Sequence, residues 1–174
     1  MQALRKIFGR GRAVIACGCA GAAVLMLMAG CIALDQDKSA AMAPDTIFAR
    51  KIVMDTINNR MDELEGMLAS ADKFDLAEAR EHADMISVML MAFPHLFPPS
   101  TNQWKPNVER DAGRDTYAAP DLWTNFADFY GRAGRASRVA FSASRAKQQS
   151  EVKTLTAELR TACNACHATY LKSD

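Results

Sequence analysis

The sequence predicts an all-α protein: an up-down-up-down four-helix bundle whose consecutive helices are antiparallel, preceded by an N-terminal export or anchor segment. Three observations predict it. Apolar residues recur at spacings of three and four, the period of an amphipathic helix, in four separate segments. Proline and capping residues mark where these segments begin. The first and second segments, and the third and fourth, are joined by short links, which makes each pair antiparallel neighbours.

The composition is compatible with one helical domain. The chain has 174 residues and a formal net charge of +1. Residues 1–30 hold four cations and no acid, so the rest of the chain has 17 Lys and Arg against 20 Asp and Glu. This mildly acidic remainder does not resemble a nucleic-acid-binding surface, and we expect no nucleic-acid partner. Ala, Met, Leu, Arg and acids dominate, and they favour helix over strand.

Residues 1–30 are expected to be a signal peptide or membrane anchor, and residues 31–43 a tether. A basic stretch ends near Arg12, and an uncharged, mostly apolar stretch follows over residues 13–34, which is typical of a secretory signal. The end of this stretch, Leu-Met-Ala-Gly-Cys, resembles a bacterial lipobox and predicts a lipoprotein lipidated at Cys31. Two alternatives stay open: an uncleaved anchor, because about 20 apolar residues span a bilayer, and cleavage after Ala41, which gives a soluble periplasmic protein. All three place the remaining chain, residues 44–174, outside the cytoplasm, in the periplasm.

The first helical segment begins at Pro44, a residue suited to a first turn. Its apolar stripe consists of Ile47, Met54, Ile57, Met61, Leu64 and Leu68. Arg50 interrupts this stripe between Ile47 and Met54. A cation there either reaches past the end of the bundle to solvent or binds an anionic group inside it.

The second helical segment begins at Asp75, an N-cap residue followed by Glu78 in a capping-box position, and ends near Pro94. Its stripe consists of Leu76, Ala79, Ala83, Ile86, Leu90 and Phe93. A long connection follows over residues 94–119, and we expect its aromatic residues Trp104 and Tyr117 to be packing lids. His82 and His95 are expected to lie on the surface or in the loop.

The third helical segment begins at Pro120, again in a first-turn position. Its stripe consists of Leu122, Phe126, Phe129, Ala133, Ala136 and Ala140. Arg132, Arg135 and Arg138 form a basic outer face, which we expect to be solvated; docking of an acidic partner is the alternative.

The fourth helical segment runs over residues 150–172, with Ser150 as its expected N-cap. Its stripe consists of Val152, Leu155, Leu159, Ala162 and Cys166. The stripe therefore directs the C-terminal part of this helix, and with it Cys166, into the bundle.

This C-terminal part contains the pentapeptide Cys163-Asn164-Ala165-Cys166-His167, the C-x-x-C-H pattern for covalent attachment of one haem c. Two thiols add to the haem vinyl groups, and the imidazole of His167 binds the iron as an axial ligand. On a helix, positions i, i+3 and i+4 share one face, so all three groups can reach one porphyrin. In this context the anion suggested for Arg50 is a haem propionate. No nucleophile or acid/base pair accompanies the motif, so we expect a haem carrier and not an enzyme.

The chain resembles the class II c-type cytochromes, the cytochrome c′ family, over roughly residues 44–172. Three places carry the resemblance: Phe48–Met54; Phe93–Pro98 with Pro120–Trp123 around the long loop; and Cys163–Tyr170. In the family, the residue four after the first-helix Arg faces the iron opposite the His. The resemblance therefore implies that Met54 is the distal axial ligand, or at least the iron-facing residue. The family usually has a basic residue where this chain has Leu171.

The resemblance implies two functions that differ at Met54. If its sulfur binds iron, the haem is six-coordinate with His/Met ligation, and the protein is an electron carrier that exchanges electrons with a redox partner protein. If Met54 only packs over the iron, the haem is five-coordinate and binds NO or CO for gas sensing or sequestration. We favour electron transfer because a thioether is a competent iron ligand. Relatives often pair through their first two helices, so a homodimer is a further option.

Overall fold

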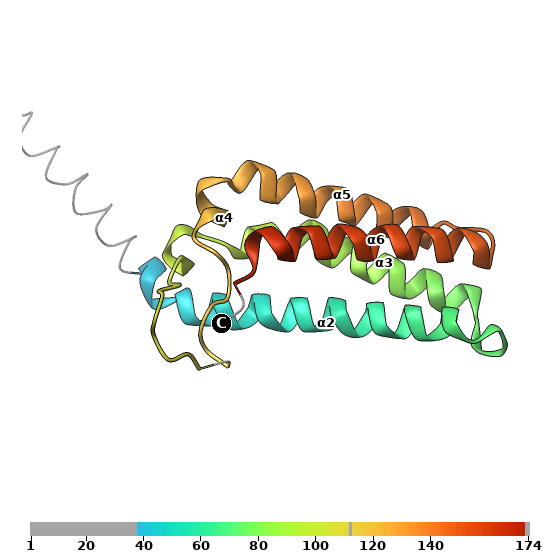
Figure 1. Ribbon diagram of the computed structural model, residues 1–174, viewed down its shortest axis with the longest axis horizontal. Helices are drawn as coiled ribbons and strands as arrows, with labels where there is room; N and C mark the ends of the chain where they lie inside the picture. Colours follow the sequence, from blue (N-terminus) through green and yellow to red (C-terminus); the bar gives the residue numbers. More distant parts are fainter. Residues whose placement is uncertain (1–37, 112, 173–174) are drawn as a thin grey trace, which may run out of the picture. The chain divides into compact units, whose positions relative to one another are not determined.

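The computed structural model describes residues 38–111 and 113–172. Four long helices form the bundle: α2 (Ala43–Ala69), α3 (Leu76–Ala92), α5 (Phe126–Ser144) and α6 (Gln149–Tyr170) (Figure 1). A short helix, α4 (Asp121–Thr124), and the 3-10 turns η1 (Ala71–Lys73), η2 (Phe93–Leu96) and η3 (Pro99–Thr101) lie between them. The described residues contain no strand, only an isolated bridge between Ala118 and Leu171. The predicted all-α four-helix fold is therefore confirmed.

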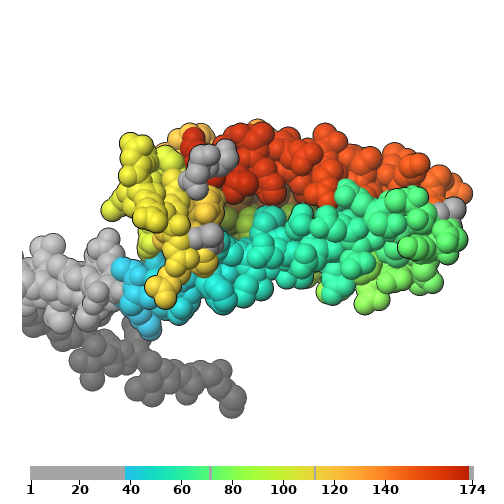
Figure 2. Space-filling model, turned by 60° about the horizontal axis from the view of Figure 1, so that its bottom comes forward, coloured from blue at the N-terminus to red at the C-terminus, as the bar shows by residue number. Residues whose placement is uncertain are grey.

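Consecutive long helices are neighbours in the bundle, as the up-down-up-down prediction requires. The most extensive packing joins α3 to α5, then α5 to α6, and α2 to α3. The contact between α2 and α6 is much smaller. The two helices thus leave room between them, and Figure 2 shows a hollow between the blue-green atoms of α2 and the red atoms of α6.

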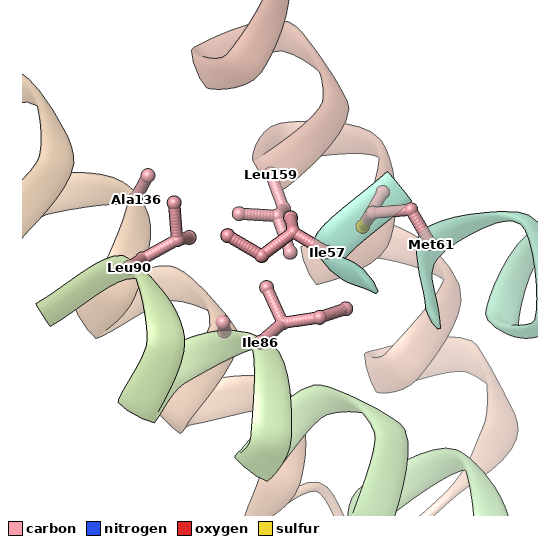
Figure 3. Close-up of a cluster of buried hydrophobic side chains, with 7 residues drawn as sticks. Ile57, Met61, Ile86, Leu90, Ala136 and Leu159 are labelled. Atoms are coloured by element: carbon pink, nitrogen blue, oxygen red, sulfur yellow. The ribbon is translucent and has the colours of Figure 1, made fainter. Parts of the chain in front are cut away.

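The centre of the core is built from all four long helices. Ile57 and Met61 from α2, together with Leu159 from α6, meet residues of α3 and α5 in one apolar cluster (Figure 3). The α5 members are small, Ala136 and Ala140, and this allows α3 and α5 to approach closely. The periodic spacing of apolar residues in the sequence is the cause of this layer, because it gives each helix one buried face.

Two of the predicted helix starts have different outcomes. Asp75 caps α3 as predicted, because its carboxylate accepts hydrogen bonds from the backbone N–H groups of Ala77 and Glu78 at 2.7 and 3.0 Å. The prediction of Ser150 as the N-cap of the last helix is wrong, since α6 begins at Gln149. The Glu151 carboxylate in its first turn accepts the N–H of Lys147 at 2.8 Å, and this side chain stabilises the earlier start.

The third predicted helix is interrupted at Asn125. Asn125 has non-helical dihedral angles, φ −112° and ψ 34°, and separates α4 from α5. Leu122 in α4 is buried, whereas Phe126, the first residue of α5, packs on Phe129 but is 37% exposed at the end of the helix. The prediction that Phe126 is buried is wrong, because the residue stands at the helix start, where the bundle does not fully cover it. The other stripe positions, from Phe129 to Ala140, are buried as predicted.

The export segment and Cys31 lie outside the described residues. Within residues 38–43, the last part of the predicted tether, residues 38–41 are helical and the Ser39 hydroxyl donates to the Ser100 hydroxyl at 3.0 Å. In the part of the chain that the structure describes, no helix combines the length and the apolar character needed to cross a bilayer.

Candidate haem-binding site

The C-x-x-C-H motif lies on the last two turns of α6, and its Cys163, Cys166 and His167 line a cavity of about 310 Å³. Cys163 and Cys166 are half-buried free thiols. His167 lines the same cavity, as predicted from the i, i+3, i+4 spacing of the motif. The structure therefore brings both predicted attachment thiols and the predicted axial imidazole to one space.

The wall of this cavity is apolar and comes from all four long helices. Phe93, Phe97 and Phe129 form an aromatic cluster against which Met54 and Cys166 pack. Other apolar residues that line the cavity are Ile57, Leu90, Leu122, Ala133, Ala136 and Ala162. A cavity with apolar walls and a few polar groups is the usual form of a cofactor site, and a porphyrin, which is flat and apolar, is compatible with it.

The protonation of the motif residues follows from partial desolvation at the cavity: the two thiols are half-buried, whereas His167 keeps an exposed part of its surface. Burial raises the pKa of the Cys166 thiol to about 11 and also raises the pKa of Cys163. Both are therefore thiols at neutral pH in the folded chain. Burial, with a smaller effect of the charge of Arg160, lowers the pKa of His167. The imidazole is consequently neutral at neutral pH, which is the form that binds a metal.

Met54 is half-buried on α2 and lines the cavity together with His167 of α6. The two residues thus approach the same space from different helices. Ile57, one turn further along α2, also lines the cavity, whereas Met61, at the next turn, belongs to the central core cluster. Met54 is therefore the methionine of α2 that lies at the cavity.

Arg50 is buried, with only 4% of its surface exposed. Its guanidinium donates to the hydroxyl of Thr101 at 2.9 Å and to the hydroxyl of Thr116, and lies 4.5 Å from the centre of the Phe97 ring. It makes no ion pair with any residue that the structure describes. Burial lowers its pKa to about 10. The alternative in which Arg50 reaches solvent past the bundle end is wrong.

A buried cation without a counter-ion fits an anionic group in the cavity. Arg50 lines the cavity, and a buried charge is costly unless an opposite charge compensates it. Its neutral hydroxyl partners do not supply that charge. The donor set of Cys163, Cys166, His167 and Arg50 therefore fits haem c, whose vinyl groups, iron and propionates require thiols, an imidazole and a cation.

The long connection between η2 and α4 closes one end of the cavity. Lys51 donates to the backbone carbonyl of Asp115 at 2.7 Å, and its ammonium lies 5.1 Å from the centre of the Tyr117 ring. The backbone N–H of Ala119 donates to the Tyr170 carbonyl at 2.8 Å. Tyr117 lines the cavity as the expected lid, whereas Trp104 packs against Arg110.

The two remaining histidines lie away from the cavity. His95 is exposed in η2, as expected. His82 is buried, contrary to the expectation of a surface position. Its Nδ1 lies 3.4 Å from Arg60 and its Nε2 lies 3.7 Å from the Glu78 carboxylate. The imidazole thus connects α3 with α2 without lining the cavity.

The sequence profile described as Cytochrome C' matches residues 45–171. The chain belongs to the cytochrome c′ family. Two similar proteins are named Cytochrome c-556: one from Agrobacterium fabrum (strain C58 / ATCC 33970) is 29% identical over 133 residues, 75% of this chain and 84% of that protein. The other, from Agrobacterium tumefaciens (strain II Chrys), is 28% identical over 123 residues, 70% of this chain and 92% of that protein.

Solved structures of cytochromes c′ share the fold. Cytochrome c′ from Thermochromatium tepidum has a TM-score of 0.64 at 21% identity, over 75% of this chain and 97% of that one. Cytochrome c′ from Rhodopseudomonas palustris has a TM-score of 0.64 at 22% identity, over 75% and 98%. An NMR-validated structural model of oxidised cytochrome c556 from R. palustris has a TM-score of 0.62 at 18% identity, over 75% of this chain and 98% of that one. The four-helix bundle is thus the cytochrome c′ fold.

One cation at the cavity was expected to be solvated, because its spacing in the sequence placed it on the basic outer face of the third helix. Arg132 lines the cavity. Its Nε donates to the Asp128 carboxylate at 2.6 Å, and the buried Tyr170 donates its hydroxyl to the same oxygen at 2.6 Å. Leu171, at the position where relatives usually have a basic residue, is 51% exposed. The i, i+4 spacing of Asp128 and Arg132 was the signal in the sequence that indicated this ion pair.

We expect Tyr170→Phe to weaken the bundle of this cytochrome c′ chain in a pH-dependent way. The hydrogen bonds from Tyr170 and Arg132 lower the pKa of Asp128. A carboxyl with a lowered folded-state pKa stabilises the fold above its unfolded pKa, about 3.9, and loses that contribution as pH falls through the folded value. The loss of stability in Tyr170→Phe should therefore be clear at neutral pH and shrink below about pH 4.

Urea unfolding of the wild type and variant across this pH range tests the expectation. Tyr130→Phe is the matched control, because the Tyr130 hydroxyl makes no hydrogen bond with residues that the structure describes. It should leave the unfolding free energy unchanged at every pH. An equal loss of stability at neutral and acidic pH in Tyr170→Phe would contradict the role of the Asp128 carboxylate.

Proposed function

We propose that this chain is a periplasmic electron carrier with one covalently bound haem c, whose iron is held by His167 and Met54. The main support for this proposal is that Met54 and His167 line one apolar cavity from two different helices. His/Met ligation is the set that cytochromes c use to raise the reduction potential. Membership of the cytochrome c′ family and the likeness to proteins named Cytochrome c-556 support the electron-carrying role.

The protein supplies attachment, orientation and exclusion of water, while the haem supplies one-electron chemistry at its iron. The thiols of Cys163 and Cys166 form the two thioether bonds. Arg50 binds a propionate, which provides the counter-ion that this guanidinium lacks among the described residues. Phe93, Phe97 and Phe129 keep the cavity apolar, and the neutral imidazole of His167 holds the iron.

The N-terminal segment supports a periplasmic location in this proposal. Lipidation at Cys31 anchors the bundle to a membrane through residues 31–43, with uncleaved anchor and soluble forms as alternatives. Mass spectrometry of the mature protein distinguishes the three. A lipid-modified N-terminus at Cys31 supports the anchored form, and an N-terminus at Met42 contradicts it.

The optical spectrum of the holoprotein tests the ligand assignment. We expect a low-spin ferric spectrum with a methionine-to-iron charge-transfer band, and a ferrous spectrum that CO does not change, because both axial positions are filled. A high-spin ferric spectrum with ready CO binding contradicts the His/Met proposal. That outcome favours the five-coordinate alternative, in which the protein binds NO or CO.

A further inference from the structure

The outer side of α5 carries three arginines and one acid, Asp128, with which both Arg132 and Arg135 interact electrostatically. We name Tyr130, Gly131, Gly134, Arg135 and Arg138 the basic face. At 3.6 residues per turn they fall within an arc of about 140°. Arg135 and Arg138 are exposed, and neither makes an ion pair within residues 38–111 and 113–172. Both guanidinium groups can therefore also form ion pairs with an external partner.

The exposed acids gather on other helices. Asp128, an acid on α5, is held by Arg132 and Tyr170. In contrast, α2 and α3 expose many carboxylates: Asp45, Asp55, Asp62, Glu63, Glu78, Glu81 and Asp84. Such a separation of charge orients an approaching charged protein before contact. An acidic surface is attracted to α5 and repelled by α2 and α3.

Beside the cavity, α5 carries small residues on both its inner and its outer side, and we call residues 131–136 its thin section. Ala133 and Ala136 line the cavity on its inner side, while Gly131 and Gly134 face outward. A helix backbone has a Cα radius of about 2.3 Å, against an overall diameter of about 10–12 Å with side chains. The Gly–Ala section therefore brings an external surface closer to the cavity than an ordinary helix would.

No local constraint requires glycine at these two positions. Both have negative φ, and a Cβ on Gly131 or Gly134 would meet only the guanidinium of Arg135 or Arg138, at 3.4 and 3.5 Å. Each glycine in a helix costs about 1 kcal/mol relative to alanine. The glycines leave space in which one guanidinium nitrogen of Arg135 and one of Arg138 lie close to the helix backbone.

We propose that the basic face is the docking surface for an acidic electron-transfer protein, and that electrons cross the thin section of α5. The inference rests on the proposed electron-carrier function. One electron leaves the reduced centre of one protein and reduces the oxidised centre of the other, from Fe(III) to Fe(II) when this chain accepts it. No covalent bond or proton moves. Arg and Tyr are also enriched at protein interfaces.

The test measures the electron-transfer rate of the holoprotein on gold electrodes with a carboxylate-terminated monolayer, as a defined acidic surface, at about 10 mM salt, where screening is weak. The double variant Arg135→Gln/Arg138→Gln should lose about tenfold in rate, and the rate should lose most of its dependence on salt. The matched control is Lys73→Gln/Lys153→Gln, which removes the same charge from exposed positions outside α5. It should keep the wild-type rate.

Equal losses in both double variants would overturn the proposal, because net charge alone would then explain the effect. An unchanged rate in Arg135→Gln/Arg138→Gln would also overturn it. A third outcome would also overturn it: the wild type binds phosphatidylglycerol vesicles, and Arg135→Gln/Arg138→Gln loses this binding but keeps its electrode rate. The basic face would then bind a membrane surface. A mediated redox titration of the same samples separates these outcomes from failure of the proposed function, which would show as absence of a reversible haem couple.

Gly134→Leu tests the crossing point. Leucine favours helix, so the free energy of unfolding should hold or rise, and the added side chain should hold the electrode away from the cavity. The rate on the carboxylate monolayer should fall while the midpoint potential stays unchanged. An unchanged rate would overturn the assignment of the thin section as the electron path.

Discussion

Met54→Ala is expected to convert the holoprotein from a low-spin, six-coordinate form to a high-spin, five-coordinate form. In the proposed His/Met ligation, removing the thioether would leave the iron with His167 as its protein ligand. Apart from Cys163, Cys166 and His167, no other sulfur or imidazole among the described residues lines the cavity. The ferrous variant should bind CO, which the wild type should not. The reduction potential should fall, because His/Met ligation raises it.

The same substitution also removes half-buried apolar volume. Methionine-to-alanine changes in cores cost about 2–5 kcal/mol, and the partial exposure of Met54 places it at the lower end. The optical spectrum measures the charge-transfer band, the spin state and CO binding. Unfolding by denaturant measures the loss of stability.

Met61→Ala is the matched control for Met54→Ala. Met61 lies on α2, is 1% exposed and packs in the central cluster away from the cavity. The Met61→Ala variant should lose at least as much stability as Met54→Ala, about 2–5 kcal/mol. It should keep the low-spin spectrum and should not bind CO. If Met54→Ala has the same spectrum as Met61→Ala, Met54 only packs beside the haem and the proposed ligation is wrong.

Arg50→Met is expected to destabilise the holoprotein by about 3–5 kcal/mol, the usual cost of removing one partner of a buried ion pair. The guanidinium is buried, and in our proposal a haem propionate is its counter-ion. Without the cation, burial raises the pKa of that propionate. Reduction should then be coupled to proton uptake, so the midpoint potential should fall as pH rises. Chemical denaturation and redox titration across pH measure the two effects.

Thr101→Val separates the charge of Arg50 from its hydrogen bonds. The Thr101 hydroxyl accepts from Arg50 at 2.9 Å and donates to the Pro98 carbonyl at 2.8 Å. Its loss should cost about 1–3 kcal/mol and leave the potential independent of pH, because the cation stays. If Arg50→Met also leaves the potential independent of pH, Arg50 anchors the long loop and does not bind a propionate.

The helices were predictable because their signals are local. Each stripe repeats within one segment, and burial of one face follows from it. Arg50 was identified in the same way, as a charged break in an apolar stripe. The errors were at single residues whose state depends on neighbours in other elements. The interruption at Asn125 places Phe126 at the start of α5, where it is partly exposed, and packing between α2 and α3 buries His82.

The helical bundle and haem attachment at Cys163, Cys166 and His167 could both be predicted from the sequence alone, because periodicity and the attachment motif are properties of short segments. Only the tertiary structure showed that Arg50 is buried without a described counter-ion, and that Arg132 belongs to the cavity. Only it separated Arg132, which is paired with Asp128, from Arg135 and Arg138, which are not. The three arginines are alike in sequence, and their roles diverge because α5 and α6 pack so that Tyr170 and Asp128 meet beside one of them.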